Sequence, residues 1–164
     1  CRILICDHRI SLDEKALRLI EFYETHHRLG YMIFEWLFTY RPLLAWKHFD
    51  HSLSERLSDV LWRVGEENLD LDIIASNTYL RELFSARGSL ELAEGSSKFE
   101  LDTLITLRRC SAAKATLQFE YTCDECNQIS FLPFHRCPHC HAIDSVQSIM
   151  NLSKERFEEN NSLQ

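Results

Sequence analysis

The sequence predicts a mainly α-helical protein that ends in a small β module, and three observations support this fold class. The 164 residues include only four Gly and three Pro, a composition typical of a helix-rich globular chain. Apolar residues recur at helical spacing as far as residue 109. Beyond residue 115 they alternate with polar residues and lead into two Cys-x-x-Cys pairs. We therefore expect a helical domain at 1–112, a β module at 115–150 and a polar C-terminal tail at 151–164.

Two helices joined by a turn are expected in the first third of the chain. Ser11-Leu12-Asp13-Glu14 has the form of a capping box, which predicts a helix start, and Gly30 is a typical helix stop. The next helix is expected from about Tyr31 to Tyr40. Pro42 interrupts it, because proline clashes with the preceding turn, and residues 43–49 are expected to resume as one or two turns.

Three further helices are expected before the β module. A second capping box, Ser52-Leu53-Ser54-Glu55, predicts the start of the first. Asp70 or Asp72 is expected to cap the second, which Arg87-Gly88 closes, and a loop at 88–97 separates it from a short helix at 99–109.

Antiparallel helix pairs at 11–50 and 52–88 favour a tetratricopeptide-like repeat array. Identity between the two pairs is poor and no clean tetratricopeptide signature is present. A plain helical bundle is the alternative.

From Ala115 onward the pattern becomes that of strands. Leu117, Phe119 and Tyr121 are separated by single polar residues, which is the period-two signal of a strand. A second strand is expected at 131–136 and a third at 145–150. Three short strands are too small to hold a core of their own, so we expect this module to depend on a bound metal ion.

The candidate metal ligands are Cys123, Cys126, Cys137 and Cys140. Ten residues separate the two pairs, which is enough for a hairpin that lets both pairs grip one tetrahedral ion. Four thiolates leave no position for water or substrate, so the sequence predicts a structural Zn²⁺ site with no catalytic residues. Backbone N–H groups and Arg136 are expected to temper the negative charge of the site. Iron in the same cage, as in rubredoxin, is the alternative metal.

Disulfide and redox interpretations of these cysteines are weaker. A thioredoxin-like Cys-x-x-Cys would lie beside a βαβ pattern, which does not flank either pair. Two disulfides would need an oxidising compartment, and nothing in the chain indicates secretion. His135, His139 and His141 surround the second pair, but four cysteines already satisfy the metal, so we expect these histidines to be surface or packing residues.

Charge and motifs narrow the function classes. The formal net charge of −7 argues against a nucleic-acid backbone as the main partner, because such binding needs clustered Lys and Arg. No Ser-His-Asp arrangement, phosphate-binding glycine loop or HExxH helix is visible in the sequence, so we expect no enzyme. No apolar run approaches the length of a membrane span.

The first residue is Cys rather than Met, so we expect the chain to be a piece of a longer protein. Cys1, Cys6 and Cys110 lie outside the two pairs and are interpreted as small buried apolar residues. Cys1, Cys6 and His8 match the spacing of no common metal site.

Two runs around the cysteines, Phe119–Cys126 and Phe134–Ala142, together with the apolar residue Ile149, carry a family resemblance. They resemble the C-terminal rubredoxin-like domain of the bacterial lipopolysaccharide assembly protein B family. In that family a strand ending in Tyr-x-Cys-x-x-Cys is followed, at the spacing found here, by aromatic-x-x-Cys-Pro-x-Cys. The family usually has Gly where this chain has Asn127, and Asn is the next-best residue for a left-handed turn.

This resemblance implies properties of the whole protein. The family packs its metal domain against tetratricopeptide helices that come directly before it, and its metal ligands correspond to the four cysteines. The resemblance implies an upstream membrane anchor and a place at the cytoplasmic face of the bacterial inner membrane. There the protein would act as an adaptor between the membrane protease FtsH and the deacetylase of the lipid A pathway, and would regulate lipopolysaccharide synthesis.

We therefore expect a non-enzymatic scaffold that binds proteins and no nucleic acid. The aromatic residues of the stretch 31–46 are candidate anchors for a partner where exposed, although core packing is the more usual role of such residues; they are Phe34, Trp36, Phe38, Tyr40 and Trp46. One alternative is a zinc-ribbon nucleic-acid-binding module, which the acidic residues Asp124, Glu125 and Asp144 disfavour. A second alternative is a rubredoxin-type electron carrier.

Overall fold

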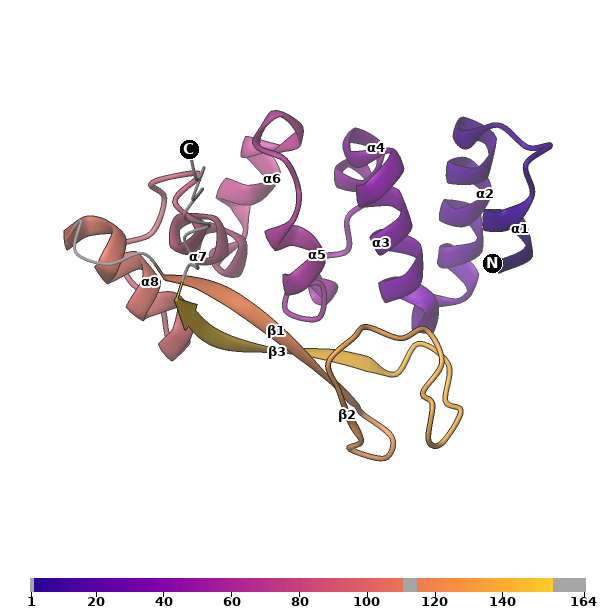
Figure 1. Cartoon of the computed structure of the whole chain (residues 1–164). Helices are drawn as coiled ribbons and strands as arrows, with labels where there is room; N and C mark the ends of the chain where they lie inside the picture. Colours follow the sequence, from indigo (N-terminus) through magenta and orange to yellow (C-terminus); the bar gives the residue numbers. More distant parts are fainter. Residues whose placement is uncertain (1, 111–114, 155–164) are drawn as a thin grey trace, which may run out of the picture.

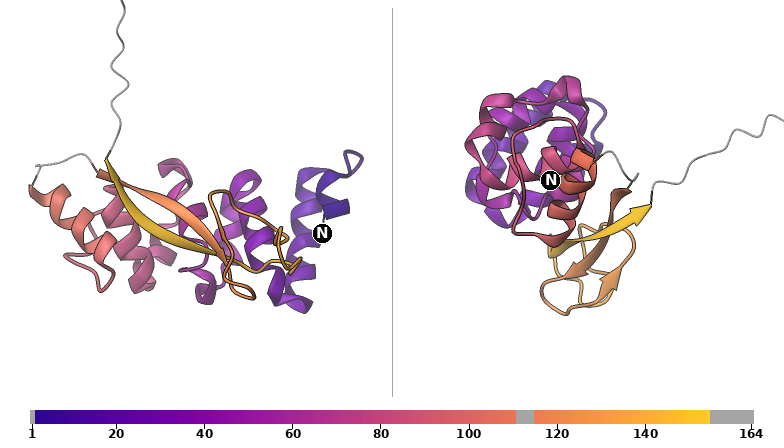
Figure 2. Two further views of the ribbon diagram at one scale, coloured as in Figure 1. Left: turned by 60° about the horizontal axis from the view of Figure 1, so that its bottom comes forward. Right: turned by 90° about the vertical axis from the view of Figure 1, so that its left-hand side faces the viewer.

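A computed structural model describes residues 2–110 and 115–154, and within this part the chain is helical with one small antiparallel sheet. The helices stand side by side in a row, and the sheet lies along one side of that row (Figures 1 and 2). This arrangement confirms a helical protein with a C-terminal β module. None of the helices in the described part is long and apolar enough to cross a membrane.

The α-helices of the described residues are α1 (Arg2–Cys6), α2 (Leu12–Thr25), α3 (Gly30–Tyr40), α4 (Pro42–Lys47), α5 (Ser58–Trp62), α6 (Leu71–Ser76), α7 (Thr78–Arg87) and α8 (Phe99–Cys110). Three single turns of 3-10 helix, η1 (His27–Leu29), η2 (His51–Leu53) and η3 (Glu66–Asn68), connect them.

The start of α2 confirms the first capping signal. Ser11 Oγ accepts the backbone N–H of Glu14 at 3.2 Å, while the Glu14 carboxylate pairs with Arg18 at 2.6 Å instead of reaching back. The expected stop at Gly30 is wrong, because α2 ends at Thr25 and Gly30 is the first residue of α3. A Cβ on Gly30 would lie 2.6 Å from Leu53 Cδ1, so this glycine allows close packing.

The second predicted capping box, at Ser52–Glu55, is not formed. Asp50 caps this segment: its Oδ1 accepts the N–H of Ser52 at 2.9 Å, and its Oδ2 accepts the Tyr23 hydroxyl at 2.6 Å. The turn η2 therefore begins at His51, and α5 starts only at Ser58. Tyr23, 27 residues earlier in the chain, helps to fix this cap. The sequence around Asp50 gives no sign of that contact.

The segment expected as one helix up to Gly88 forms two helices. Asp70 caps α6 as expected, with its Oδ1 3.1 Å from the N–H of Ile73. Asn77 then interrupts the helix in an extended conformation and caps α7 by accepting the N–H of Leu80 at 3.0 Å. Gly88 ends α7 with φ +84°, the left-handed conformation that favours glycine.

The core runs along the whole helical row. Phe34, Trp36, Phe38 and Trp46 are buried within it, whereas Tyr40 is 48% exposed. Ring contacts such as Phe38–Trp46, with centroids 4.8 Å apart, join α3 to α4. Of the candidate aromatic anchors, only Tyr40 is therefore available to a partner.

The sheet has the strand order β2-β1-β3, with β1 (Ala115–Cys123), β2 (Ile129–Ser130) and β3 (Val146–Lys154). Cys123 pairs with Val146 at one end of the β1–β3 ladder, and Ala115 pairs with Lys154 at the other. The strand β3 is longer than expected, since the nine residues of β1 give its polar end a pairing partner. Residues 155–164 of the expected tail lie outside the described residues.

The expected strand at 131–136 is wrong. The strand β2 ends at Ser130, whose Oγ accepts the N–H of Leu132 at 3.2 Å and turns the chain away from the sheet. Pro133 follows and has no N–H for a ladder. Only Arg136 makes an isolated antiparallel bridge, to Ile143.

We expect Gly88→Ala to lower the free energy of unfolding by about 1–2 kcal/mol, because an L side chain is strained in the left-handed region and its Cβ would lie 3.0 Å from Arg108 Cδ. Urea denaturation followed by circular dichroism measures this change. Gly65→Ala is the matched control, since Gly65 has φ −62° and its new methyl group would meet only the flexible end of Glu67. Equal stability of the two variants would contradict the assigned helix end.

Candidate metal centre

The four cysteines that the sequence singled out come together in the structure. Their Sγ atoms all lie within 4.8 Å of one another, with Cys123 and Cys140 3.6 Å apart and Cys126 and Cys137 3.7 Å apart. A tetrahedral ion with metal–sulfur bonds of about 2.3 Å requires sulfurs about 3.8 Å apart, whereas a disulfide bond is about 2.05 Å long. The cluster therefore has dimensions that fit one four-coordinate metal ion.

The two Cys-x-x-Cys pairs have the same backbone geometry. The N–H of Asn127 donates to the Cys123 carbonyl at 2.8 Å, and the N–H of His141 donates to the Cys137 carbonyl at 3.1 Å. Asn127 and His141 each follow the second cysteine of a pair and are left-handed, with φ +56° and +63°. Asn127 thus adopts the left-handed conformation expected of it.

Each Cys-x-x-Cys pair with its turn, here called a knuckle, also directs backbone N–H groups at one of its own sulfurs. The N–H groups of Glu125 and Cys126 point at Cys123, and those of His139 and Cys140 point at Cys137. These donors temper the negative charge of thiolates, as the sequence led us to expect. Arg136, whose charge was also expected to temper the site, donates its Nε–H to the carbonyl of His141 at 3.3 Å.

The cysteine thiols differ in acidity because of their surroundings. Burial raises the pKa of the Cys123 thiol, but the Ser145 hydroxyl at 3.1 Å and the backbone donors outweigh burial and lower this pKa to about 6. At Cys140 the N–H of Ala142 lowers the pKa, yet burial and the three neighbouring sulfurs raise it to about 12. Four thiolates this close repel one another unless a cation lies among them, and a divalent ion would favour the deprotonation of all four.

The three histidines near the second knuckle lie on its outside. His139 and His141 are exposed, and His135 points its Nε2 at Glu35 Oε2, 3.2 Å away on α3. Within residues 2–110 and 115–154, the four cysteines form the one cluster of three or more potential ligands of this type. Cys6 and Cys110 were expected to be buried, but both are exposed. Cys1 lies outside the described residues.

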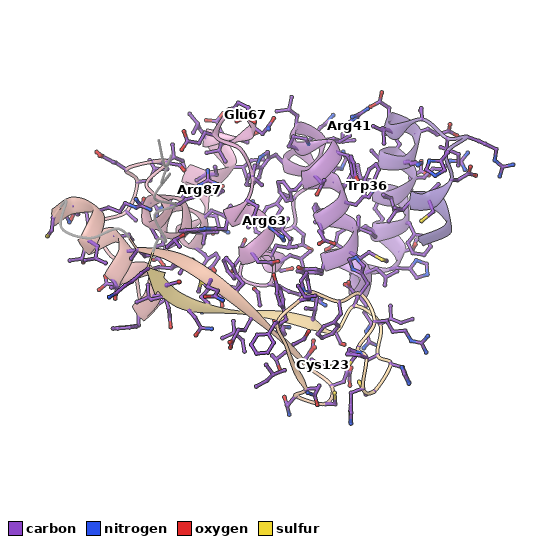
Figure 3. All side chains as sticks on the ribbon, viewed as in Figure 1. Trp36, Arg41, Arg63, Glu67, Arg87 and Cys123 are labelled. Carbon is purple, nitrogen blue, oxygen red and sulfur yellow. The ribbon has the colours of Figure 1, made fainter. Side chains whose placement is uncertain are left out.

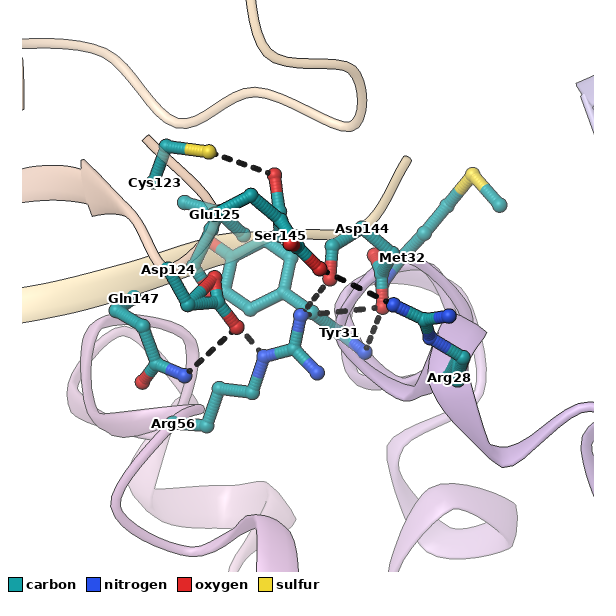
Figure 4. Close-up of polar contacts among 11 residues, drawn as sticks. Arg28, Tyr31, Met32, Arg56, Cys123, Asp124, Glu125, Asp144, Ser145 and Gln147 are labelled. Atoms are coloured by element: carbon teal, nitrogen blue, oxygen red, sulfur yellow. Dashed lines mark hydrogen bonds and ion pairs between the residues drawn. The ribbon is translucent and has the colours of Figure 1, made fainter. Parts of the chain in front are cut away.

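Asp144 joins the β module of residues 115–154, called the metal module or ribbon from here on, to the helical row. Its carboxylate is fully buried and accepts the N–H groups of Tyr31 at 3.1 Å and Met32 at 3.0 Å. These two donors belong to the first turn of α3, so Asp144 satisfies the start of a helix that lies more than 100 residues earlier. Figure 4 shows this carboxylate between α3 and the side chain of Arg56.

Arg56 holds the same corner of the metal module from the helical side. Its guanidinium lies 3.5 Å from the Asp144 carboxylate, and it donates to the carbonyl of Asp144 and, at 3.1 Å, to that of Val146. Burial raises the pKa of Asp144, while Arg56 and the N–H groups of Met32 and Tyr31 act in the opposite direction. Asp144, which the sequence analysis counted among the acidic residues around the cysteines, is thus a buried residue that anchors the metal module.

A second buried carboxylate supports the strand β1. Asp59 Oδ2 accepts the hydroxyls of Tyr31 at 2.8 Å and Tyr121 at 3.0 Å, and Arg63 pairs with it at 3.0 Å. Burial raises the pKa of Asp59 against these donors. No local sequence pattern marked Asp59 or Asp144 as a buried anchor, because each accepts hydrogen bonds from distant segments.

Comparison with family models, curated proteins and solved structures finds no match to this chain. The resemblance to the lipopolysaccharide assembly protein B family therefore rests on the knuckle residues alone.

We expect the purified chain to carry about one metal ion, because four sulfurs at these distances complete one tetrahedral shell. Elemental analysis identifies the metal. Alkylation followed by mass spectrometry should modify the exposed Cys6 and Cys110 at once, and the four cluster cysteines only after a chelator is added. Immediate alkylation of all these cysteines would contradict a metal site.

We expect Asp144→Asn to lower the free energy of unfolding by about 2–4 kcal/mol, because it leaves an N–H of α3 and the Arg56 charge without their buried partner. Chemical denaturation of the metal-loaded chain measures this loss. Asp72→Asn makes the same chemical change at an exposed position on α6 and should stay within about 0.5 kcal/mol of the unmodified chain. A similar loss in both variants would mean that the carboxylate of Asp144 is not an anchor.

Proposed function

We propose that this chain is a non-enzymatic protein-binding scaffold, in which a tetratricopeptide-like helical array carries a structural metal ribbon. The observation that carries this proposal is the combination of a four-sulfur cluster with a buried polar anchor to the helices. Four thiolates fill a tetrahedral ion, so the metal has no free position at which a substrate would react. Zn²⁺ fits this structural role, and iron is the alternative metal.

The helical row supports the scaffold part of the proposal. Neighbouring helices of the row pack on one another, as α2 does on α3 and α7 on α8. Repeat arrays are built from such contacts and present extended surfaces to other proteins. The ribbon then serves to complete and stiffen one side of the array, because Asp144 and Arg56 fix its position.

By resemblance, we propose that the scaffold regulates lipopolysaccharide synthesis at the cytoplasmic face of the bacterial inner membrane. Its protein partners would be the membrane protease FtsH and the deacetylase of the lipid A pathway. An adaptor of this kind brings a protease and its substrate together by binding both. The exposed acidic side chains of Asp124 and Glu125 at the first knuckle favour protein over nucleic acid as the partner.

We expect the metal-loaded chain, immobilised on a sensor, to bind the purified deacetylase and detergent-solubilised FtsH at the same time. Surface plasmon resonance measures each binding step, and an oligonucleotide at low salt serves as the negative control. Failure to bind either protein would remove the lipopolysaccharide assignment. Salt-sensitive binding of the oligonucleotide would support the nucleic-acid alternative instead, and a reversible redox wave from bound iron would support an electron carrier.

A further inference from the structure

A groove of about 310 Å³ lies where the metal module meets the helical row. Its walls come from α1, from α3 and from the loop before the second knuckle. The lining residues are Ile5, Cys6, Met32, Glu35, Trp36, Thr39, Tyr40 and His135. Because His135 belongs to the ribbon, this groove is complete only when the ribbon is docked.

A second groove of about 360 Å³ continues on the other side of α3. Glu35 and Thr39 line both grooves and stand one helical turn apart, so together they form a low ridge between the two. The second groove reaches Arg63 and Asn68 beyond α5. Figure 3 shows Trp36 on α3 and Arg63 at the end of α5. Because the lining residues run from α1 across α3 to Asn68, the combined space crosses the helices instead of following one of them.

The first groove has the chemistry of a site for a basic side chain. Glu35 is the one carboxylate among its lining residues, which include no Lys or Arg. The Tyr40 ring packs on the buried Trp36, with centroids 5.0 Å apart, and remains 48% exposed. An exposed aromatic ring near a carboxylate attracts ammonium and guanidinium groups. The contact of His135 Nε2 with Glu35 at 3.2 Å holds this carboxylate at the edge of the groove.

We propose that the two grooves form one docking channel for an extended segment of a partner protein. The segment places a Lys or Arg side chain at Glu35 and against Tyr40, next to an apolar side chain that contacts Ile5. Its backbone then crosses the ridge at Thr39 toward Arg63. This inference rests on the proposed scaffold function and names the kind of segment that the scaffold recognises.

The shape of the channel favours an extended protein segment over a small amine. A small amine would fill only the first groove, whereas a chain of several residues uses both grooves and the ridge between them. The net charge of −7 on the whole chain also favours approach of a basic segment.

The experiment selects, from a display library of random twelve-residue peptides, those that bind the immobilised metal-loaded chain. We expect the enriched peptides to share a Lys or Arg next to an apolar residue. Measured by fluorescence anisotropy, they should bind Thr39→Trp at least about tenfold more weakly, because the indole blocks the ridge. Glu35→Gln should weaken binding by about fivefold to tenfold, since it removes one partly exposed charge partner.

Matched controls make the same changes elsewhere. Thr106→Trp on α8 and Glu24→Gln on α2 alter exposed residues that line neither groove, and both should bind the peptides as the unmodified chain does. Circular dichroism checks that all four variants keep their helical signal.

Failure of the channel can be told apart from failure of the scaffold. Peptides that bind Thr39→Trp and Glu35→Gln as tightly as the unmodified chain would overturn the channel, and so would a selection that returns no basic peptides. In either case, binding of whole partner proteins would leave the scaffold function standing. Absence of both peptide and protein binding would overturn both proposals.

Discussion

The structure depends on the buried carboxylate of Asp144, which lies at the start of α3 and against Arg56. A helix start offers N–H groups without partners and a partial positive charge, so a carboxylate there is favourable even when buried. The first turn of α3 has no capping side chain of its own. The helix therefore takes its cap from the metal module, and the module takes its position from the helix.

The same short segment shapes the metal centre. Ser145, next to Asp144, has its hydroxyl 3.1 Å from Cys123 Sγ, and its carbonyl accepts the N–H of Asp124 at 2.9 Å. Asp144 itself is left-handed, with φ +52°, and its N–H donates to the carbonyl of His135 at 2.8 Å. Because cluster and anchor share neighbouring residues, the fold that gathers four sulfurs also sets the carboxylate at α3. A module too small for a core of its own thus gains stability from two sources, the sulfur cluster and the helical row.

Local signals in the sequence predicted the parts of the fold that local chemistry determines. The spacing of the cysteines was enough to find the cluster, and Ser11, Asp70 and Gly88 mark helix ends through bonds to residues within one or two turns. Several of the errors arise where a contact between distant segments determines the local structure. Leu53 packs against Gly30, Tyr23 joins the cap at Asp50, and Asp144 finds its partners 112 and 113 residues away. No pattern within a window of the sequence contains these pairs, so the cysteines were predictable and the anchor was not.

The position of the ribbon links the four-sulfur cluster to a groove at the surface of the helical row. The loop that carries His135 leads directly into Cys137, so the fold that gathers the four sulfurs also places this loop. That loop forms one wall of the groove beside α3 and meets Glu35 there. This groove is therefore made by both modules, and a helical row without its ribbon would lack this wall. The four-sulfur cluster therefore bears on the shape of this groove, although none of the four cysteines lines it.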